Sequence, residues 1–259
     1  MGAATDDPLL WHLPISHYSE KVRWTLDYKA VPHRRRPVTP PAHMPVAYAI
    51  TRGRGYTFPL LQIDGRVLGD STEIIATLEK RHPERPLYPS DPEALQRALE
   101  LEEYFDETTG PAARLLAFHE MRSDPDAMAE AVAGMLPPPA RSSERVAMAA
   151  GQFGKAFAAL RYGSDSDEAA DAARAALIES LDRIEAELDA GGGDYLVGDE
   201  FTVADLTAAA LLAPAVQPPE GPKLPEPPPA YERFLAPLRE RRAFEWVKQT
   251  FARHRSRPD

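Results

Sequence analysis

The chain has 259 residues, of which 43% are hydrophobic and 27% charged, and its formal net charge is −10. This length favours two compact domains, and the composition excludes wholesale disorder. The acidic balance argues against a nucleic-acid-binding protein. The absence of cysteine excludes disulfides, thiolate metal ligands and a cysteine nucleophile. Neither a membrane-spanning apolar stretch nor a signal peptide is visible, so we expect a cytoplasmic protein with no membrane partner.

Residues 8–82 predict a small α/β unit. Short apolar runs predict strands, and apolar residues three or four apart predict helices. The Asp64-Gly65 pair is typical of a hairpin turn, and Asp70 with Glu73 predicts a capping box. In chain order we expect a strand at 9–13, a helix at 19–30, a strand at 33–38, a loop at 39–57, strands at 58–63 and 66–68, and a helix at 71–82.

Four prolines within residues 83–92 predict a stiff linker, and the chain beyond it has a helical pattern. Leucine and isoleucine at 177, 181, 184 and 188 mark the clearest amphipathic helix. Gly110-Pro111 is expected to interrupt an earlier helix, and a second proline cluster, 214–229, to form an extended loop. The segment 134–166 reads as an insertion, and a final helix is expected over 231–254.

Ser16 lies between the first predicted strand and the first predicted helix, in the sequence PISHYS. A helix N-terminus offers unpaired N–H groups and a partial positive charge, which favour an anion. Ser16 could therefore hydrogen-bond a bound thiolate and lower the pKa of that thiol. The alternative is that Ser16 or Ser19 only caps the helix.

A second pair of signals lies at Phe58-Pro59 and Asp70-Ser71. Pro59 stands at the start of a strand, where the backbone of Phe58 is left free for a partner. Asp70-Ser71 begins a helix, so its hydroxyl and free N–H groups suit a ligand carboxylate. A helix cap alone explains Asp70-Ser71 equally well.

Taken in order, these features resemble the cytosolic glutathione transferases. The resemblance covers the Ser-x-x-Ser junction, Phe58-Pro59, Asp70-Ser71, the proline-rich linker and the motif FTVADL at 201–206, in which Thr202 and Asp205 would form a capping box. It implies an α/β thioredoxin-like domain at 8–82, the linker at 83–92, and an all-α helical-bundle domain at 93–259 that forms the second-substrate pocket.

The same resemblance implies roles for individual residues. Ser16 falls where serine-type members place the hydroxyl that activates the thiol of glutathione. Pro59 falls at the family's cis-proline, and the Phe58 backbone would pair with the cysteinyl part of glutathione. Asp70 and Ser71 fall where the γ-glutamyl group is held. The reaction implied is attack of glutathione on a small, apolar electrophile, or an isomerisation that uses glutathione.

Other interpretations stay open at this point. The fold could belong to a non-catalytic binding or scaffold protein, or the enzyme could use a different small thiol, because Thr57 and the proline-rich insertions depart from the family pattern. A role for His17 as a general base acting on Ser16 is disfavoured, since adjacent side chains on a turn point apart. The histidines show no ligand spacing, so we assign no metal. The resemblance also implies a homodimer, in which the thioredoxin-like domain of one subunit packs against the helical domain of its partner. The aromatic and arginine-rich edge around residues 88–97 adds support from the sequence.

Overall fold

The computed structural model describes residues 7–40, 42–122 and 143–255. The N-terminal domain is built on a four-stranded sheet in the order β2-β1-β3-β4, in which β1 pairs parallel with β2 and antiparallel with β3. The strands are β1 (Leu9–His12), β2 (Arg34–Pro37), β3 (Leu60–Ile63) and β4 (Arg66–Leu68).

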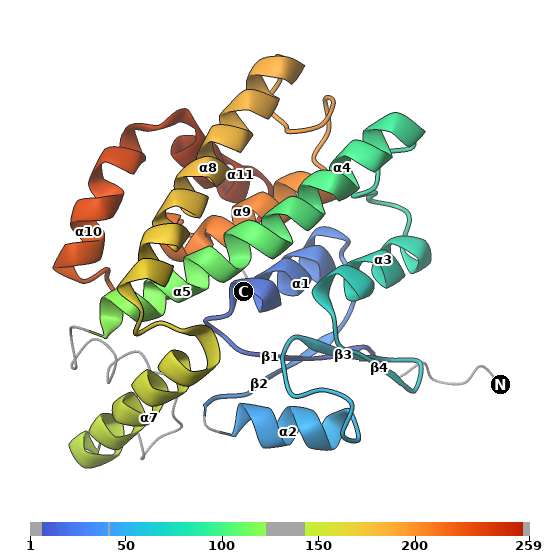
Figure 1. Ribbon diagram of the computed structural model, residues 1–259. Coiled ribbons are helices and arrows are strands. Elements are labelled where there is room, and N and C mark those ends of the chain that lie inside the picture. Colours follow the sequence, from blue (N-terminus) through green and yellow to red (C-terminus); the bar gives the residue numbers. More distant parts are fainter. Residues whose placement is uncertain (1–6, 41, 123–142, 256–259) are drawn as a thin grey trace.

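The two faces of this sheet are covered by different helices (Figure 1). The helices α1 (His17–Tyr28) and α3 (Ser71–Arg81) cover one face and α2 (His43–Ile50) covers the other. Side chains alternate between the faces of a strand. Leu10 and Leu61, which are paired, therefore lie in the core beneath α1 and α3, whereas Leu60 packs toward α2.

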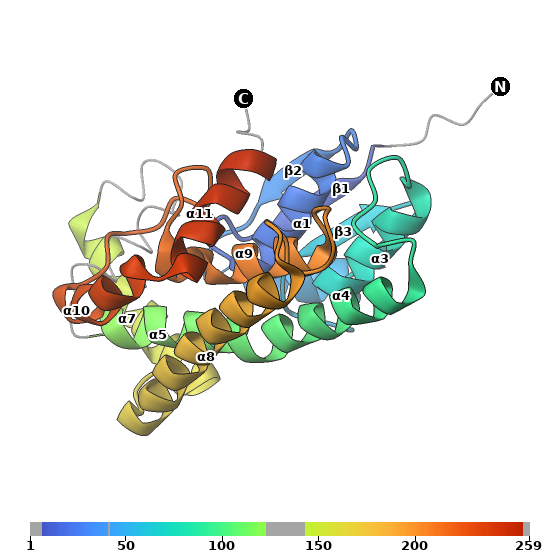
Figure 2. The same cartoon turned by 90° about the horizontal axis from the view of Figure 1, so that it is seen from above.

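The rest of the described chain is helical. Its elements are α4 (Pro92–Tyr104), a π-helical turn (Phe105–Thr109), α5 (Gly110–Met121), α7 (Glu144–Tyr162), α8 (Asp167–Gly191), α9 (Val203–Val216), α10 (Pro229–Leu235), a 3-10 segment (Ala236–Glu240) and α11 (Arg242–His254). Every residue of α9 is buried, and this helix packs against α1, α4, α5 and α11 (Figure 2). The predicted fold class, an α/β domain followed by a helical domain, is confirmed.

The two domains share one hydrophobic core. Trp24 and Ile75 of the N-terminal domain belong to the same buried cluster as α4, α5, α8, α9 and α11. The Trp24 ring lies 4.4 Å from the Phe251 ring, and its Nε1 donates to the carbonyl of His254 at 3.0 Å. This shared core fixes the two domains against each other, and the cleft between them has a defined shape.

The Thr202–Asp205 capping box at the start of α9 is present as predicted. The carboxylate of Asp205 accepts hydrogen bonds from the backbone N–H and hydroxyl of Thr202 and from the N–H of Leu196, each at 2.8 Å. Phe201 stacks on His254 with ring centroids 4.1 Å apart and also packs near Trp24. The motif therefore joins α9 to both α1 and α11.

Several sequence predictions were wrong in the loops. The predicted loop 39–57 contains α2, and Gly110-Pro111 continues the chain from the π-helical turn into α5. Pro214 lies inside the last turn of α9 and Pro229 begins α10, so the proline-rich loop spans only 217–228. The predicted final helix is three elements, α10, the 3-10 segment and α11. Of the predicted insertion 134–166, the described part contains α7, and residues 134–142 lie outside the described residues.

Candidate functional site

A pocket of about 1310 Å³, including its open mouth, lies between the two domains. Its floor is formed by the loop after β1 and the segment before β3, and its walls by α5, α7 and the loop 217–228. Most of the lining side chains are apolar or aromatic. The lining residues include Ser16, Phe58, Arg114, Phe118, Phe157 and Tyr231.

Ser16 is the N-cap of α1, with extended backbone angles (φ −77°, ψ 124°). Its Oγ accepts a hydrogen bond from the N–H of Ser19 at 3.2 Å. A hydroxyl has one donor and two acceptor positions, so this contact leaves the Ser16 proton available to a ligand. Ser19 is buried, and its Oγ accepts from the N–H of Leu13 at 3.3 Å. Ser16 therefore both caps the helix and lines the pocket.

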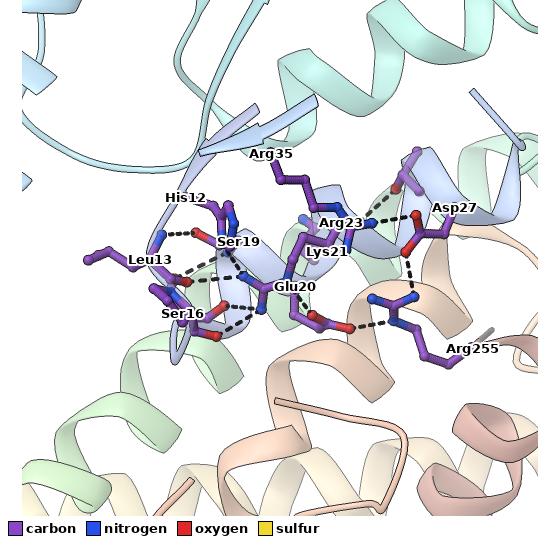
Figure 3. Close-up of polar contacts among 12 residues, drawn as sticks. His12, Leu13, Ser16, Ser19, Glu20, Lys21, Arg23, Asp27, Arg35 and Arg255 are labelled. Carbon is purple, nitrogen blue, oxygen red and sulfur yellow. Dashed lines mark hydrogen bonds and ion pairs between the residues drawn. The ribbon is translucent and has the colours of Figure 1, made fainter. Parts of the chain in front are cut away.

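The loop that carries Ser16 is held from behind by Arg23 (Figure 3). The Arg23 guanidinium donates to the carbonyls of Leu13 and Pro14, both at 3.1 Å, and to the carbonyl of Ser16 at 3.5 Å. It also donates to Nδ1 of His12 at 2.8 Å. Burial and, after it, the nearby positive charge of Arg23 lower the pKa of His12 to about 3, so the ring is neutral.

The charge of Arg23 is balanced by Glu20, whose side chain is 2% exposed. Glu20 accepts from Arg23 at 2.7 Å and from Arg255, at the far end of the chain, at 2.6 Å. Arg255 also pairs with Asp27 at 2.6 Å (Figure 3). Arg255 is thus part of the support of the Ser16 loop.

His17 and Tyr18 face the helical domain and are unsuited to act as bases. The His17 Nε2 lies 2.9 Å from the carbonyl of Gly110, and burial lowers the pKa of His17 to about 3. The Tyr18 hydroxyl donates to the carbonyl of Asp106 at 2.7 Å, and burial raises the pKa of Tyr18. The fit is close, since a Cβ on Gly110 would overlap the Tyr18 hydroxyl.

The structure brings some of the predicted glutathione residues into the pocket wall and leaves others outside it. Ser16 and Phe58 line the pocket, whereas Pro59, Asp70 and Ser71 do not. The Phe58–Pro59 peptide bond is cis, as the resemblance implied. The exposed carboxylate of Asp70 caps α3, accepting from the N–H groups of Thr72 and Glu73 at 2.9 and 3.1 Å, and Ser71 is buried.

Residues 10–86 match the family model of the glutathione S-transferase N-terminal domain, and residues 167–236 match that of the C-terminal domain. The chain belongs to the glutathione S-transferase superfamily. A probable maleylacetoacetate isomerase from Caenorhabditis elegans is 28% identical over 156 residues, 60% of this chain and 53% of the relative. The matched segment therefore spans about half the length of that relative.

Solved structures support the same transferase fold. A glutathione transferase from Phanerochaete chrysosporium superposes with a TM-score of 0.64 at 17% identity, covering 98% of this chain and 100% of the other. A maleylacetoacetate isomerase from Anaeromyxobacter dehalogenans gives a TM-score of 0.58 at 20% identity, covering 95% of this chain and 86% of the other.

Beyond the residues that the sequence singled out, this glutathione S-transferase homologue has polar groups in the pocket wall without a partner. They are Nε of Arg114, Nδ1 of His43 and the hydroxyl of Tyr231, all buried and without a hydrogen bond among the described residues. Nothing in the sequence marked them, because they come from α5, α2 and α10 and meet only through the fold.

A different set of missed residues is fully paired. Lys21 is buried and donates to Glu102 at 3.0 Å and to Asp106 at 2.5 Å, which ties α1 to α4 and the π-helical turn. The Thr72 hydroxyl also donates to Glu102, at 2.7 Å. In the described part of the chain, no group of three or more potential metal ligands is present, and no helix has the length and apolar character of a membrane span.

Proposed function

We propose that this protein binds glutathione and lowers the pKa of its thiol for attack on a small electrophile. The observation that carries the proposal is the position of Ser16, whose hydroxyl lines the interdomain pocket with its proton free to donate. A hydroxyl aimed at a thiolate stabilises the charged form and lowers the thiol pKa. Sulfur then forms the new bond to the electrophilic carbon as that carbon loses its leaving group, or as the electron pair of its double bond moves to the neighbouring atom and takes up a proton. The thiol proton leaves to solvent.

The remaining predicted residues fit the rest of the tripeptide. The Phe58 backbone would pair with the cysteinyl group beside Pro59. Asp70 is exposed at the start of α3, where its carboxylate suits the ammonium of the γ-glutamyl group, and the Ser71 hydroxyl lies at the same helix start. His17, whose pKa burial lowers to about 3, is too weak a base to compete, and burial keeps Tyr18 a neutral phenol by raising its pKa. Ser16 is therefore the group proposed to act on the thiol.

The second substrate would bind in the apolar part of the pocket. Phe118, Met121 and Phe157 line it from the helical domain, and the loop 217–228 adds Leu224 and prolines. Burial of an apolar electrophile against these side chains supplies affinity roughly in proportion to the area removed from water. The similarity to a maleylacetoacetate isomerase favours glutathione-dependent isomerisation as a second candidate reaction in the same pocket.

Calorimetric titration with glutathione, followed by conjugation to 1-chloro-2,4-dinitrobenzene, tests this function. Binding with turnover is the expected result. Binding without turnover would favour the non-catalytic interpretation or the isomerisation, and absence of binding would point to a different thiol.

We also propose the domain boundaries 8–82 and 93–259, and a homodimer. A light-scattering mass near 28.6 kDa, that of one chain, would contradict the dimer.

A further inference from the structure

Arg114 is a cation in the pocket wall whose charge no described acidic group balances. It lies on α5, and its guanidinium carbon is 4.4 Å from the ring centroid of Tyr162 and 5.6 Å from that of Tyr18. No carboxylate of the described residues lies within ion-pairing distance of it, and its Nε is buried without a hydrogen bond. Aromatic faces stabilise a cation but leave N–H donors available.

The surrounding pocket wall is positive, although the chain as a whole carries −10. Arg114 and Arg161 line the pocket, and Glu226 is the one acidic side chain among its described lining residues. His17 and His43 add no charge, because burial lowers the pKa of both rings. Tyr18 and Tyr231 remain neutral phenols, because burial raises their pKa. The acidic Asp106 behind Tyr18 is engaged by Lys21.

Unpartnered buried polar groups are rare in folded proteins, and a bound ligand is one explanation for them. Here Arg114, His43 and Tyr231 contribute such groups to one pocket, and aromatic side chains line the space between them. A ligand that completes this arrangement has an apolar body and an acidic group. A guanidinium binds a carboxylate or sulfonate through charge-assisted hydrogen bonds, the strongest class available to it.

We propose that Arg114 determines specificity by binding an acidic group on an otherwise apolar, aromatic second substrate. This inference rests on the proposed function, because Ser16 lines the same pocket. The acidic group would pair with the Arg114 guanidinium between Tyr18 and Tyr162. The apolar body would lie against Phe118 and Phe157, and the Tyr231 hydroxyl is a further hydrogen-bond donor in the same wall.

The test uses two fluorescent probes that differ by one sulfonate, 1-anilinonaphthalene-8-sulfonate and the uncharged N-phenyl-1-naphthylamine, in the absence of glutathione. We expect the wild-type protein to bind the anionic probe at least about tenfold more tightly. Arg114→Gln should weaken the anionic probe by about tenfold or more and leave the neutral probe within about twofold. Arg114→Lys, which keeps the charge, should retain a preference for the anion.

Two further variants serve as controls. Arg66→Gln removes an exposed arginine of β4 that lies outside the pocket and should change neither affinity. Ala117→Trp fills the pocket from α5 and should weaken both probes. Thermal unfolding establishes that each variant is folded. If Arg114→Gln does not fold, Arg114→Lys and Ala117→Trp still report on the charge and on the location.

Several results would overturn the inference. These are equal wild-type affinity for the two probes, equal weakening of both by Arg114→Gln, or tight binding of the anionic probe to Ala117→Trp. A tenfold loss of glutathione affinity in Arg114→Gln would also overturn it, because Arg114 would then serve the tripeptide. Since the probes are measured without glutathione, failure of the protein to bind glutathione would contradict the proposed function and leave this inference standing.

Discussion

The buried cations behind the Ser16 loop and the cation in front of it differ in their partners. Behind the loop, Lys21 lies between Glu102 and Asp106, and Arg23 is matched by Glu20. In front of it, Arg114 lies against the rings of Tyr18 and Tyr162 and has no ion pair with a described residue. A buried charge without a partner costs several kcal/mol, so the set behind the loop must be complete for the fold to be stable.

The difference indicates separate duties for the two regions. The paired groups fix the position of the loop, since Arg23 binds the carbonyls of Leu13 and Pro14 and is itself held by Glu20. The groups in the pocket are positioned by packing and leave hydrogen-bonding capacity unused. Substitutions behind the loop should therefore change stability, and substitutions in the pocket should change ligand binding.

The largest loss of stability is expected for Lys21→Met. The variant leaves the buried carboxylates of Glu102 and Asp106 without their cation, and breaking a buried ion pair in this way costs about 3–5 kcal/mol. Denaturant unfolding measures the loss. The control is Lys80→Met on the exposed side of α3, which should cost little. An equal loss in both variants would show that the paired set does not stabilise the fold.

A smaller effect is expected for Asp205→Asn, which replaces an acceptor of hydrogen bonds from Leu196 and Thr202 by an amide. At neutral pH the variant should lose about 1–3 kcal/mol, because donors are left unpaired. Burial raises the pKa of Asp205 from 3.8 to about 6. The folded state therefore binds this proton more tightly than the unfolded state.

The contribution of Asp205 to stability is then greatest below pH about 4 and decreases as the pH rises through about 6. The stability difference between wild type and Asp205→Asn should shrink over that window. Urea unfolding at several pH values measures it. A difference that stays constant between those values would contradict the raised pKa.

The smallest change in stability is expected for Tyr231→Phe. The Tyr231 hydroxyl is buried without a partner, so its removal should leave stability unchanged or raise it by up to about 1 kcal/mol. Tyr18→Phe is the matched control, because the Tyr18 hydroxyl donates to the carbonyl of Asp106 and its loss should cost about 1 kcal/mol. If Tyr231→Phe costs as much as Tyr18→Phe, the Tyr231 hydroxyl has a partner and the contrast between the regions fails.

The sequence predicted the fold class because its strands, its long helix at 167–191 and the Thr202–Asp205 box carry strong local signals. It missed α2, since Thr39-Pro40-Pro41 suggested a loop and Ala42 provides no side-chain cap, although Pro45 lies in the first turn of the helix. Proline is tolerated in the first turn, where its missing N–H would have no helical partner. The last turn of α9 was missed because Pro214 lies within it.

The candidate site was predictable only where function follows from a local motif. Ser16, Phe58 and Asp70 stand at recognisable strand and helix ends, and the resemblance supplied their roles. Arg23 was not singled out, because its bonds to the carbonyls of Leu13 and Pro14 form only once that loop folds against α1. Arg255 was not singled out because Glu20, which it binds, lies 235 positions away in the sequence. Arg114 and Tyr231 carry no local signal at all. Their pairing state is a property of the folded pocket.

The central claim is that Ser16 stabilises the thiolate of bound glutathione, and the absorbance of that thiolate against pH tests it most directly. Hydrogen bonds to charged groups are worth about 1.5–3 kcal/mol, and about 1.36 kcal/mol corresponds to one pKa unit. In Ser16→Ala the pKa of the bound thiol should rise by about one to two units, whereas Ser19→Ala should change stability more than the thiol pKa. A bound thiol with the same pKa in wild type and Ser16→Ala would reduce Ser16 to a helix cap and contradict the claim.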